Sequence, residues 1–180
     1  MILVVGLGNP GNQYHNTRHN IGFLVLDFFS KQYSFEITSK KFNAHYSEVT
    51  LFDQKIFFIK PQTFMNLSGP AVKHFMDFYK IPSQKTIIIH DDIDLPFETI
   101  RKKVKGGHAG HNGLKSIMEA LGTDQFLRLR MGVGRPPPFG DTTEVSDYVL
   151  SQFNTEEKQK LPLLLKKSSE LLEKTLIDLR

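Results

Sequence analysis

Short apolar runs alternate along the chain with segments whose apolar residues recur every three or four positions. Residues 2–5 and 86–90 are almost uninterrupted apolar runs, and such runs predict strands that are buried on both faces of a sheet. Three segments have helical spacing, which predicts amphipathic helices. Their apolar positions are Ile21, Leu24, Val25, Phe28 and Phe29; Val72, Phe75, Met76 and Tyr79; and Leu114, Ile117, Met118 and Leu121.

Other stretches predict antiparallel additions to these units. Residues 47–52 and 55–60 are strand-like and meet at Asp53-Gln54, which predicts a hairpin. Residues 99–104 suit a short edge strand. Apolar and basic residues alternate over 126–133, so we expect the arginines there to point out of the sheet.

The remaining segments predict a loop and helix ends. We expect Ser68 to cap the second helix, and Asn154 to cap a C-terminal helix that Pro162 kinks or splits. Residues 136–141 predict a stiff loop, with too little chain after it for another core. We therefore expect residues 1–180 to form a single α/β domain, with a mixed twisted β-sheet flanked by helices.

Polar residues follow three of the predicted strands. Asn9 follows the first strand, Asn66 follows residues 55–60, and Asp91 follows residues 86–90. If these strands are parallel, their carboxyl ends share one edge of the sheet, which is where open α/β sheets build their sites. We therefore expect an active-site crevice at the carboxyl ends of the central strands, with His19 close by.

Composition excludes several classes of protein. The chain has 180 residues, of which 39% are hydrophobic and 23% charged, and this composition is typical of a soluble globular protein. It has no apolar run of about 18 residues, so we expect no membrane span, and its first residues do not resemble a signal peptide. The absence of cysteine rules out disulfides and thiolate chemistry and is compatible with the cytoplasm.

The positive charge is concentrated in one part of the chain. Residues 98–135 hold eight basic and three acidic residues, a surplus of five, whereas the whole chain has a net charge of +4. A solvated basic face is one interpretation of this segment. The glycine-rich stretch 106–111 favours another, a phosphate cradle of exposed backbone beside fixed cations.

The run Gly6–Gly11 matches the pattern G-x-G-x-x-G, which raises the possibility of a dinucleotide site. In such sites the helix begins inside the motif, and an acidic residue follows at the end of a second strand. Here the polar residues 12–20 intervene, and the corresponding acid, Asp27, lies within a predicted helix. A dinucleotide cofactor is therefore a minor alternative.

His19 is the strongest candidate for chemistry. It lies in a polar loop beside a glycine-rich turn, with carboxylates expected at the end of another strand. A neutral imidazole oriented by an acid is the usual general base near pH 7. Because the chain has no cysteine and no serine in a G-x-S-x-G turn, we expect the base to activate water directly.

Several candidates have a structural alternative. His90 with Asp91, Asp92 and Asp94, or the pair His108-x-x-His111, could hold a metal, although the spacing is not that of a typical zinc helix. Asn66 and Asn112 could each cap a helix, and Asn9 could form an Asx turn. Phe64 and Met65 could be buried anchors or an exposed apolar surface for a base or side chain.

Four sequence blocks together resemble the bacterial peptidyl-tRNA hydrolase family, and the matching region runs in order from residue 1 to about residue 153. The blocks are GLGNPG at 6–11 with Tyr14 and TRHN at 17–20, KPQTFMNLSG at 60–69, HDDIDLP at 90–96, and GGHAGHNG at 106–113. The resemblance implies hydrolysis of the ester that joins a peptide to tRNA. It also implies a monomeric α/β fold in the cytoplasm that needs no metal or other cofactor.

The resemblance also implies roles for individual residues. His19 is similar to the family's general base, Asp91 to the acid that keeps it basic, and Asn9 to the residue that distinguishes blocked from free amino groups. Substrate- or tRNA-binding positions are Tyr14, Phe64, Met65, Asn66, Asn112, His111, Arg101, Lys103 and Arg130. Two departures, Ala109 and Lys105, stand where the family often has glycine. A tRNA-binding module without catalysis is the alternative from another class.

Overall fold

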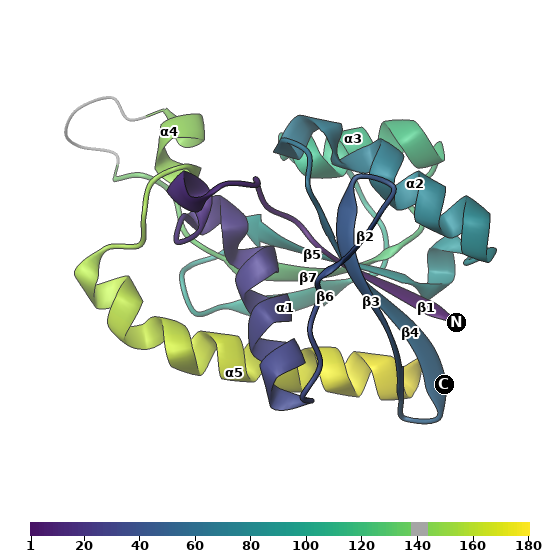
Figure 1. The fold of residues 1–180 in the computed structure, drawn as a ribbon. Coiled ribbons are helices and arrows are strands. Elements are labelled where there is room, and N and C mark those ends of the chain that lie inside the picture. Colours follow the sequence, from purple (N-terminus) through teal and green to yellow (C-terminus); the bar gives the residue numbers. More distant parts are fainter. Residues whose placement is uncertain (138–143) are drawn as a thin grey trace.

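A seven-stranded mixed sheet forms the centre of the computed structural model, which describes residues 1–137 and 144–180 (Figure 1). The strand order is β2-β3-β4-β1-β5-β7-β6. Parallel pairing joins β1 (Ile2–Gly6), β4 (Gln54–Pro61), β5 (Thr86–Asp92) and β7 (Leu127–Gly132). Antiparallel pairing adds β2 (Ser39–Lys41), β3 (Ala44–Leu51) and β6 (Ile100–Lys103). The predicted α/β class with a mixed sheet is confirmed.

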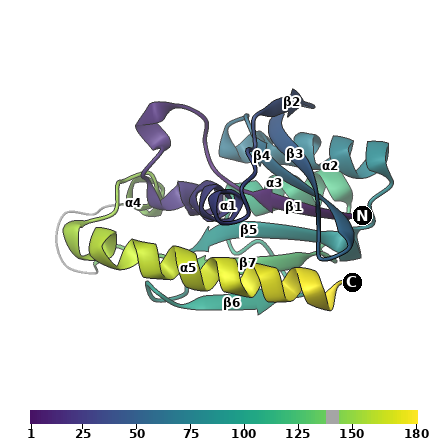
Figure 2. The same ribbon diagram turned by 60° about the horizontal axis from the view of Figure 1, so that its bottom comes forward.

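Helices cover both faces of this sheet (Figures 1 and 2). One face packs against α1 (Ile21–Gln32) and α5 (Thr155–Asp178), and the other against α2 (Ser68–Tyr79) and α3 (Asn112–Leu121). Successive side chains of a strand point to opposite faces, so the apolar residues of β1 alternate between two buried clusters. This explains why the central strands have no polar face. The short helix α4 (Val145–Val149) precedes α5.

Gly22 allows α1 to approach the sheet very closely. A Cβ atom at this position would lie 2.4 Å from the backbone oxygen of Ile89 and 2.5 Å from the backbone nitrogen of Leu7. No side chain fits in this space. The first turn of α1 therefore rests on the ends of β1 and β5, and the residues just before it, including His19, are held at the carboxyl edge of the sheet.

One of the predictions about helix ends is wrong. Ser68 does not cap α2; it is the first residue of that helix, and its Oγ donates to the backbone oxygen of Met65 at 2.8 Å. Of the two alternatives for Pro162, a split does not occur, since α5 continues without a break, and a kink stays a prediction. A proline removes one helical hydrogen bond, but Leu164, Leu172 and Leu176 of α5 are buried in the core, and this packing holds the helix together.

The loop predicted over residues 136–141 lies outside the described residues from position 138 onward. Among the residues on either side of that gap, no helix is long and apolar enough to cross a membrane.

Candidate active site

The carboxyl ends of the central strands border a cleft of about 650 Å³. Because β1 is parallel to both β4 and β5, the strand ends bring Asn9, Asn66 and Asp91 to one edge of the sheet, where all three line the cleft. His19 joins them from the 3-10 turn Arg18–Asn20 that leads into α1. The crevice predicted from the strand pattern is therefore present.

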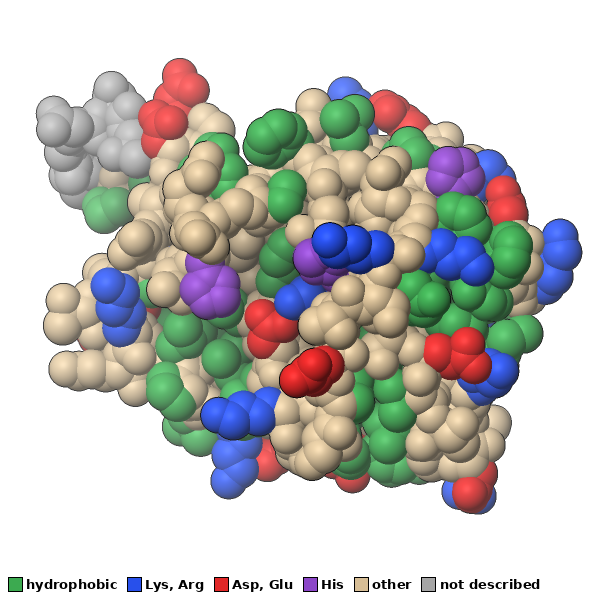
Figure 3. Space-filling model, in the orientation of Figure 1, with side chains coloured by type: hydrophobic (Ala, Val, Ile, Leu, Met, Phe, Trp, Pro, Cys, Tyr) green, Lys and Arg blue, Asp and Glu red, His purple; other side chains and the backbone are tan. Residues whose placement is uncertain are grey.

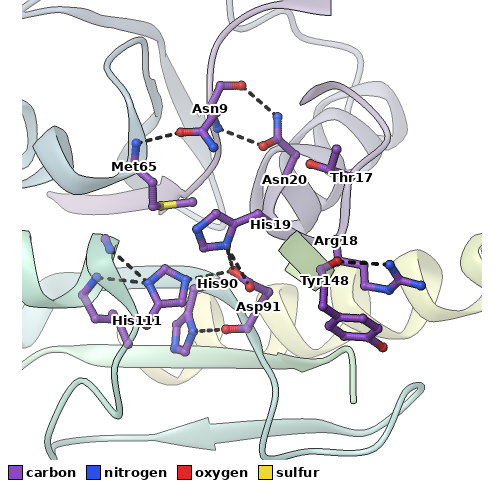
Figure 4. Close-up of polar contacts among 12 residues, drawn as sticks. Asn9, Thr17, Arg18, His19, Asn20, Met65, His90, Asp91, His111 and Tyr148 are labelled. Atoms are coloured by element: carbon purple, nitrogen blue, oxygen red, sulfur yellow. Dashed lines mark hydrogen bonds and ion pairs between the residues drawn. The ribbon is translucent and has the colours of Figure 1, made fainter. Parts of the chain in front are cut away.

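His19 and Asp91 form a close pair in this cleft. The His19 Nδ1 atom lies 2.9 Å from both carboxylate oxygens of Asp91, and both side chains are largely buried. Burial alone would lower the pKa of His19, but the charge and hydrogen bond of Asp91 outweigh it and raise that pKa. With Nδ1–H donated to the carboxylate, the lone pair of Nε2 is left to accept a proton. Figure 4 shows this second nitrogen pointing away from Asp91.

A second imidazole binds the same carboxylate. His111 Nε2 lies 2.8 Å from Asp91 Oδ1. Burial would raise the pKa of Asp91, but its contacts with the two imidazoles outweigh burial and lower it well below its usual range. Asp91 is thus a permanent anion. The predicted substrate-binding role of His111 stays a prediction, since His111 lines the cleft but has both ring nitrogens bonded within the protein.

His90 lies behind this cluster and is held neutral. Its Nδ1–H donates to the backbone oxygen of Asp91 at 2.7 Å, and its Nε2 is buried without a partner in the described structure. Burial, followed by the nearby His111, lowers the pKa of His90 to about 3. His90 is therefore uncharged at neutral pH and supports the backbone that carries Asp91.

Asn9 is held so that only one of its side-chain groups remains available. The Asn20 side chain forms two hydrogen bonds with the backbone of Asn9. Its Oδ1 accepts from the Asn9 backbone nitrogen at 2.8 Å, and its Nδ2 donates to the Asn9 backbone oxygen at 2.9 Å. The Oδ1 atom of Asn9 accepts from the backbone nitrogen of Met65 at 2.7 Å. The amide NH₂ of Asn9 remains to face the cleft (Figure 4). Asn9 thus links β1 to the loop after β4, instead of forming an isolated Asx turn.

Neither of the other two asparagines caps a helix. Leu67 precedes α2 without any side-chain cap, and His111 caps α3 by accepting from the backbone nitrogens of Gly113 and Leu114. Asn66 and Asn112 are exposed, line the cleft and have no side-chain hydrogen bond to another described residue. Their amides are therefore available to a bound molecule.

The rim of the cleft carries an exposed aromatic side chain. Phe64 is 57% exposed, whereas its neighbour Met65 is buried. Tyr14 approaches the Phe64 ring edge-on, with the ring centroids 6.4 Å apart. Of the two alternatives drawn from the sequence, Phe64 is an exposed apolar surface, and Met65 is a buried anchor that also borders the cleft; binding of a substrate by Phe64 stays a prediction.

Five side chains at the cleft that could offer ligand atoms to a metal each have a partner within the protein: His19, Asp91, His111, Asp92 and Asp94. His19, Asp91 and His111 offer ligand atoms within 4.8 Å of one another, but their nitrogens meet the carboxylate directly at hydrogen-bond distances of 2.8–2.9 Å. An ion between them would need nitrogen contacts of about 2.0–2.1 Å and a deprotonated Nε2 on His111. Asp92 and Asp94 are paired with arginines. This geometry favours proton transfer over metal binding.

Strands β6 and β7 place the basic residues beside the cleft. Arg101 is opposite Arg130, and Lys103 is opposite Arg128. Arg101 and Lys103 are exposed, while Arg130 is partly buried and donates from Nε to Asp92 at 2.7 Å. On the face shown in Figure 3, by contrast, charges of both signs are interspersed.

The prediction that the arginines of the 126–133 strand point outward is wrong for Arg128. This side chain is only 2% exposed, and its guanidinium donates to the backbone oxygens of Gly106 and Gly107. The glycine-rich loop lies against this face of β7, so the Arg128 side chain is buried beneath the loop and holds it at the edge of the cleft.

Comparison with known proteins decides the family. The family model for peptidyl-tRNA hydrolase matches residues 3–179. The chain belongs to the peptidyl-tRNA hydrolase family. The peptidyl-tRNA hydrolase of Pelobacter propionicus is 48% identical over 173 residues, covering 96% of this chain and 88% of its own. That of Bacillus subtilis is 42% identical over 176 residues, covering 98% of this chain and 92% of its own.

The fold is also that of the family. The crystal structure of peptidyl-tRNA hydrolase from Acinetobacter baumannii superposes with a TM-score of 0.84 at 34% identity, covering 94% of this chain and 83% of that one. All four sequence blocks that resemble this family contribute residues to the cleft between the strand ends and the glycine-rich loop.

One residue that supports the site stands in the TRHN block, but no role was predicted for it from the sequence. Arg18, which precedes His19, is buried and bound by Glu157 from the first turn of α5. The predicted cap at Asn154 is confirmed, and Glu157 completes it as the second member of a capping box. Nothing in the local pattern connected it with Arg18, 139 positions away.

Proposed function

We propose that this chain hydrolyses the ester bond between peptide and tRNA in peptidyl-tRNA, with His19 as general base and Asp91 as its partner. One observation carries the assignment of roles. His19 Nδ1 is fixed by an anionic carboxylate, and the other ring nitrogen faces a cleft that also presents three asparagine amides. This is the arrangement that proton removal from water requires.

The reaction follows from this geometry. His19 Nε2 takes a proton from water as the water oxygen attacks the ester carbonyl carbon, and the Asp91 carboxylate stabilises the resulting imidazolium. The amides of Asn66 and Asn112 donate hydrogen bonds to the oxyanion of the tetrahedral intermediate. The bond to the ribose oxygen then breaks, and the imidazolium returns its proton to that oxygen. The products are a free peptide and a free tRNA.

Asn9 provides a basis for selecting blocked substrates. Because its Oδ1 is occupied by Met65, only the NH₂ group of Asn9 is available, and this group is a hydrogen-bond donor. A peptidyl group offers it the carbonyl oxygen of the preceding residue. A free α-ammonium group has only donors and a positive charge, so it cannot satisfy Asn9.

The basic residues at the cleft suit the RNA part of the substrate. Arg101, Lys103 and Arg130 lie on β6 and β7, and Lys103 and Arg130 also line the cleft. Contacts of this kind with phosphates predict binding that weakens steeply as salt is raised. We further propose that the chain, residues 1–180, acts as a single-domain monomer in the cytoplasm, where translation supplies this substrate, and that it needs no metal or other cofactor.

The decisive experiment compares a labelled peptidyl-tRNA with the matching unblocked aminoacyl-tRNA. We expect release of peptide from the first and little release of amino acid from the second, with unchanged rates after chelator treatment. Tight, salt-sensitive binding of tRNA without cleavage would identify a binding module instead. Loss of activity with chelator would restore the metal hypothesis.

Asn9→Asp tests the selection step without removing the bond to Met65. Aspartate keeps an acceptor for the Met65 nitrogen but turns a second oxygen, in place of the NH₂ group, toward the cleft. We expect the preference for peptidyl-tRNA over aminoacyl-tRNA to fall at least tenfold. An unchanged preference would show that another group makes the selection.

A further inference from the structure

Asp91 holds two imidazoles that have different surroundings. His19 presents its second nitrogen to the cleft, as described above. His111 instead has both ring nitrogens bonded within the protein, Nε2 to Asp91 Oδ1 at 2.8 Å and Nδ1 to the backbone of α3. His111 therefore has no free nitrogen for a proton transfer, and its close approach to the catalytic pair needs another explanation.

The hydrogen bonds of His111 show which of its ring nitrogens donates to Asp91. Its Nδ1 accepts from the backbone nitrogens of Gly113 at 3.1 Å and Leu114 at 3.3 Å, so Nδ1 carries no proton. The proton of the neutral ring is then on Nε2 and is donated to Asp91. His111 thus donates from Nε2 to Asp91 while its Nδ1 accepts from the N-terminus of α3 (Figure 4).

We propose that His111 is a positioning residue that sets the proton affinity of His19 by sharing the Asp91 carboxylate. Each hydrogen bond donated to a carboxylate partly neutralises its negative charge. When His111 donates to Oδ1, less of that charge is available to stabilise a proton on His19. This role rests on the proposed function, in which His19 is the base.

The other charged and titratable groups around the cluster do not replace this effect. His90 lies behind it on β5, with its ring centroid 5.2 Å from that of His111, and is held neutral by burial. Asp92, also on β5, is paired with Arg130 of β7. His19 and His111 are the two side chains with polar atoms bonded to the Asp91 carboxylate among the described residues.

Two substitutions separate the two bonds of His111. In His111→Asn, the side-chain oxygen occupies the place of Nδ1 and keeps the cap on α3, because asparagine is a favoured residue there, but it is too short to reach Asp91. In His111→Gln, the amide reaches Asp91 as a neutral donor in the place of Nε2. The pKa of His19 is measured in each protein by NMR titration of its Cε1–H resonance, without substrate.

His111→Asn should raise the pKa of His19 by at least about 0.5 units, because a hydrogen bond to a carboxylate is a strong one. The acidic limb of the kcat/KM profile should move to higher pH by the same amount. His111→Gln should leave both close to the wild-type values. The role is overturned if His111→Asn leaves the His19 titration unchanged, or if His111→Gln shifts it equally.

Peptide release tests the proposed function, whereas the NMR titration of His19 tests the role of His111, so either can fail without the other. If the wild-type protein released no peptide from peptidyl-tRNA, the proposed function would fall, while the NMR titration would still report whether His111 controls the proton affinity of His19.

Discussion

Arg18 connects the turn that carries His19 with the first turn of α5. Its Nη2 donates to Glu157 Oε1 at 2.6 Å and its Nε to Oε2 at 3.2 Å, and the two side chains are only 6% and 9% exposed. The same guanidinium donates to the backbone oxygen of Tyr148 at 3.1 Å. Glu157 also accepts from the backbone nitrogen of Asn154 at 2.9 Å as part of a capping box. Replacing Glu157 therefore tests how the base-bearing turn is held.

The expected cost of Glu157→Ala follows from these contacts. Removing one partner of a buried ion pair costs about 3–5 kcal/mol, because the other charge stays buried. Arg18 keeps its bond to Tyr148, which favours the lower end, while loss of half the capping box adds up to about 1 kcal/mol. We expect the free energy of unfolding to fall by about 3–4 kcal/mol. Glu157→Gln keeps acceptors for Arg18 and Asn154 and should lose about half as much.

Urea unfolding followed by circular dichroism measures both variants. Asp77→Ala provides the control, because it breaks an exposed ion pair with Lys73 on α2 and should leave stability essentially unchanged. Hydrolysis by Glu157→Ala should also fall under conditions where the protein stays folded, because Arg18 directly precedes His19. A loss below about 1 kcal/mol for Glu157→Ala would refute the view that this pair holds the turn.

Three further changes test other parts of the site. Asp91→Asn removes the charge that raises the pKa of His19, so the acidic limb of the rate profile should move to lower pH while the rate falls; an unchanged limb would assign the partner's role elsewhere. Lys103→Ala should raise KM several-fold for full-length peptidyl-tRNA but not for a minimal ester, and an equal effect on both would argue against a tRNA contact. Gly22→Ala should cost about 1–3 kcal/mol in urea unfolding, since its Cβ would meet the backbone oxygen of Ile89 at 2.4 Å; wild-type stability would show that α1 moves freely.

The sequence predicted the central features of the fold because they depend on local patterns. Apolar runs and helical spacing identified the strands and helices, and parallel pairing of the central strands then placed Asn9, Asn66 and Asp91 together. The strand β2 was missed because its three residues, Ser39–Lys41, are polar and have no apolar periodicity.

The features that the sequence did not predict depend on contacts between distant segments. An alternating strand pattern cannot show that the glycine-rich loop packs against the face of β7, so the burial of Arg128 was unexpected. The bond between His111 and Asp91 depends on where α3 begins relative to β5. The pairing of Arg18 with Glu157 likewise needs the packing of α5 beside α1.

Single-turnover hydrolysis of peptidyl-tRNA by the His19→Ala variant tests the central claim most directly. With Nε2 gone, no group is left at that position to take the proton from water, so the rate should fall by about a hundredfold or more. Binding of tRNA, measured in parallel, should stay within a few-fold of wild type. A rate close to that of the wild-type protein would contradict the assignment of His19 as the base.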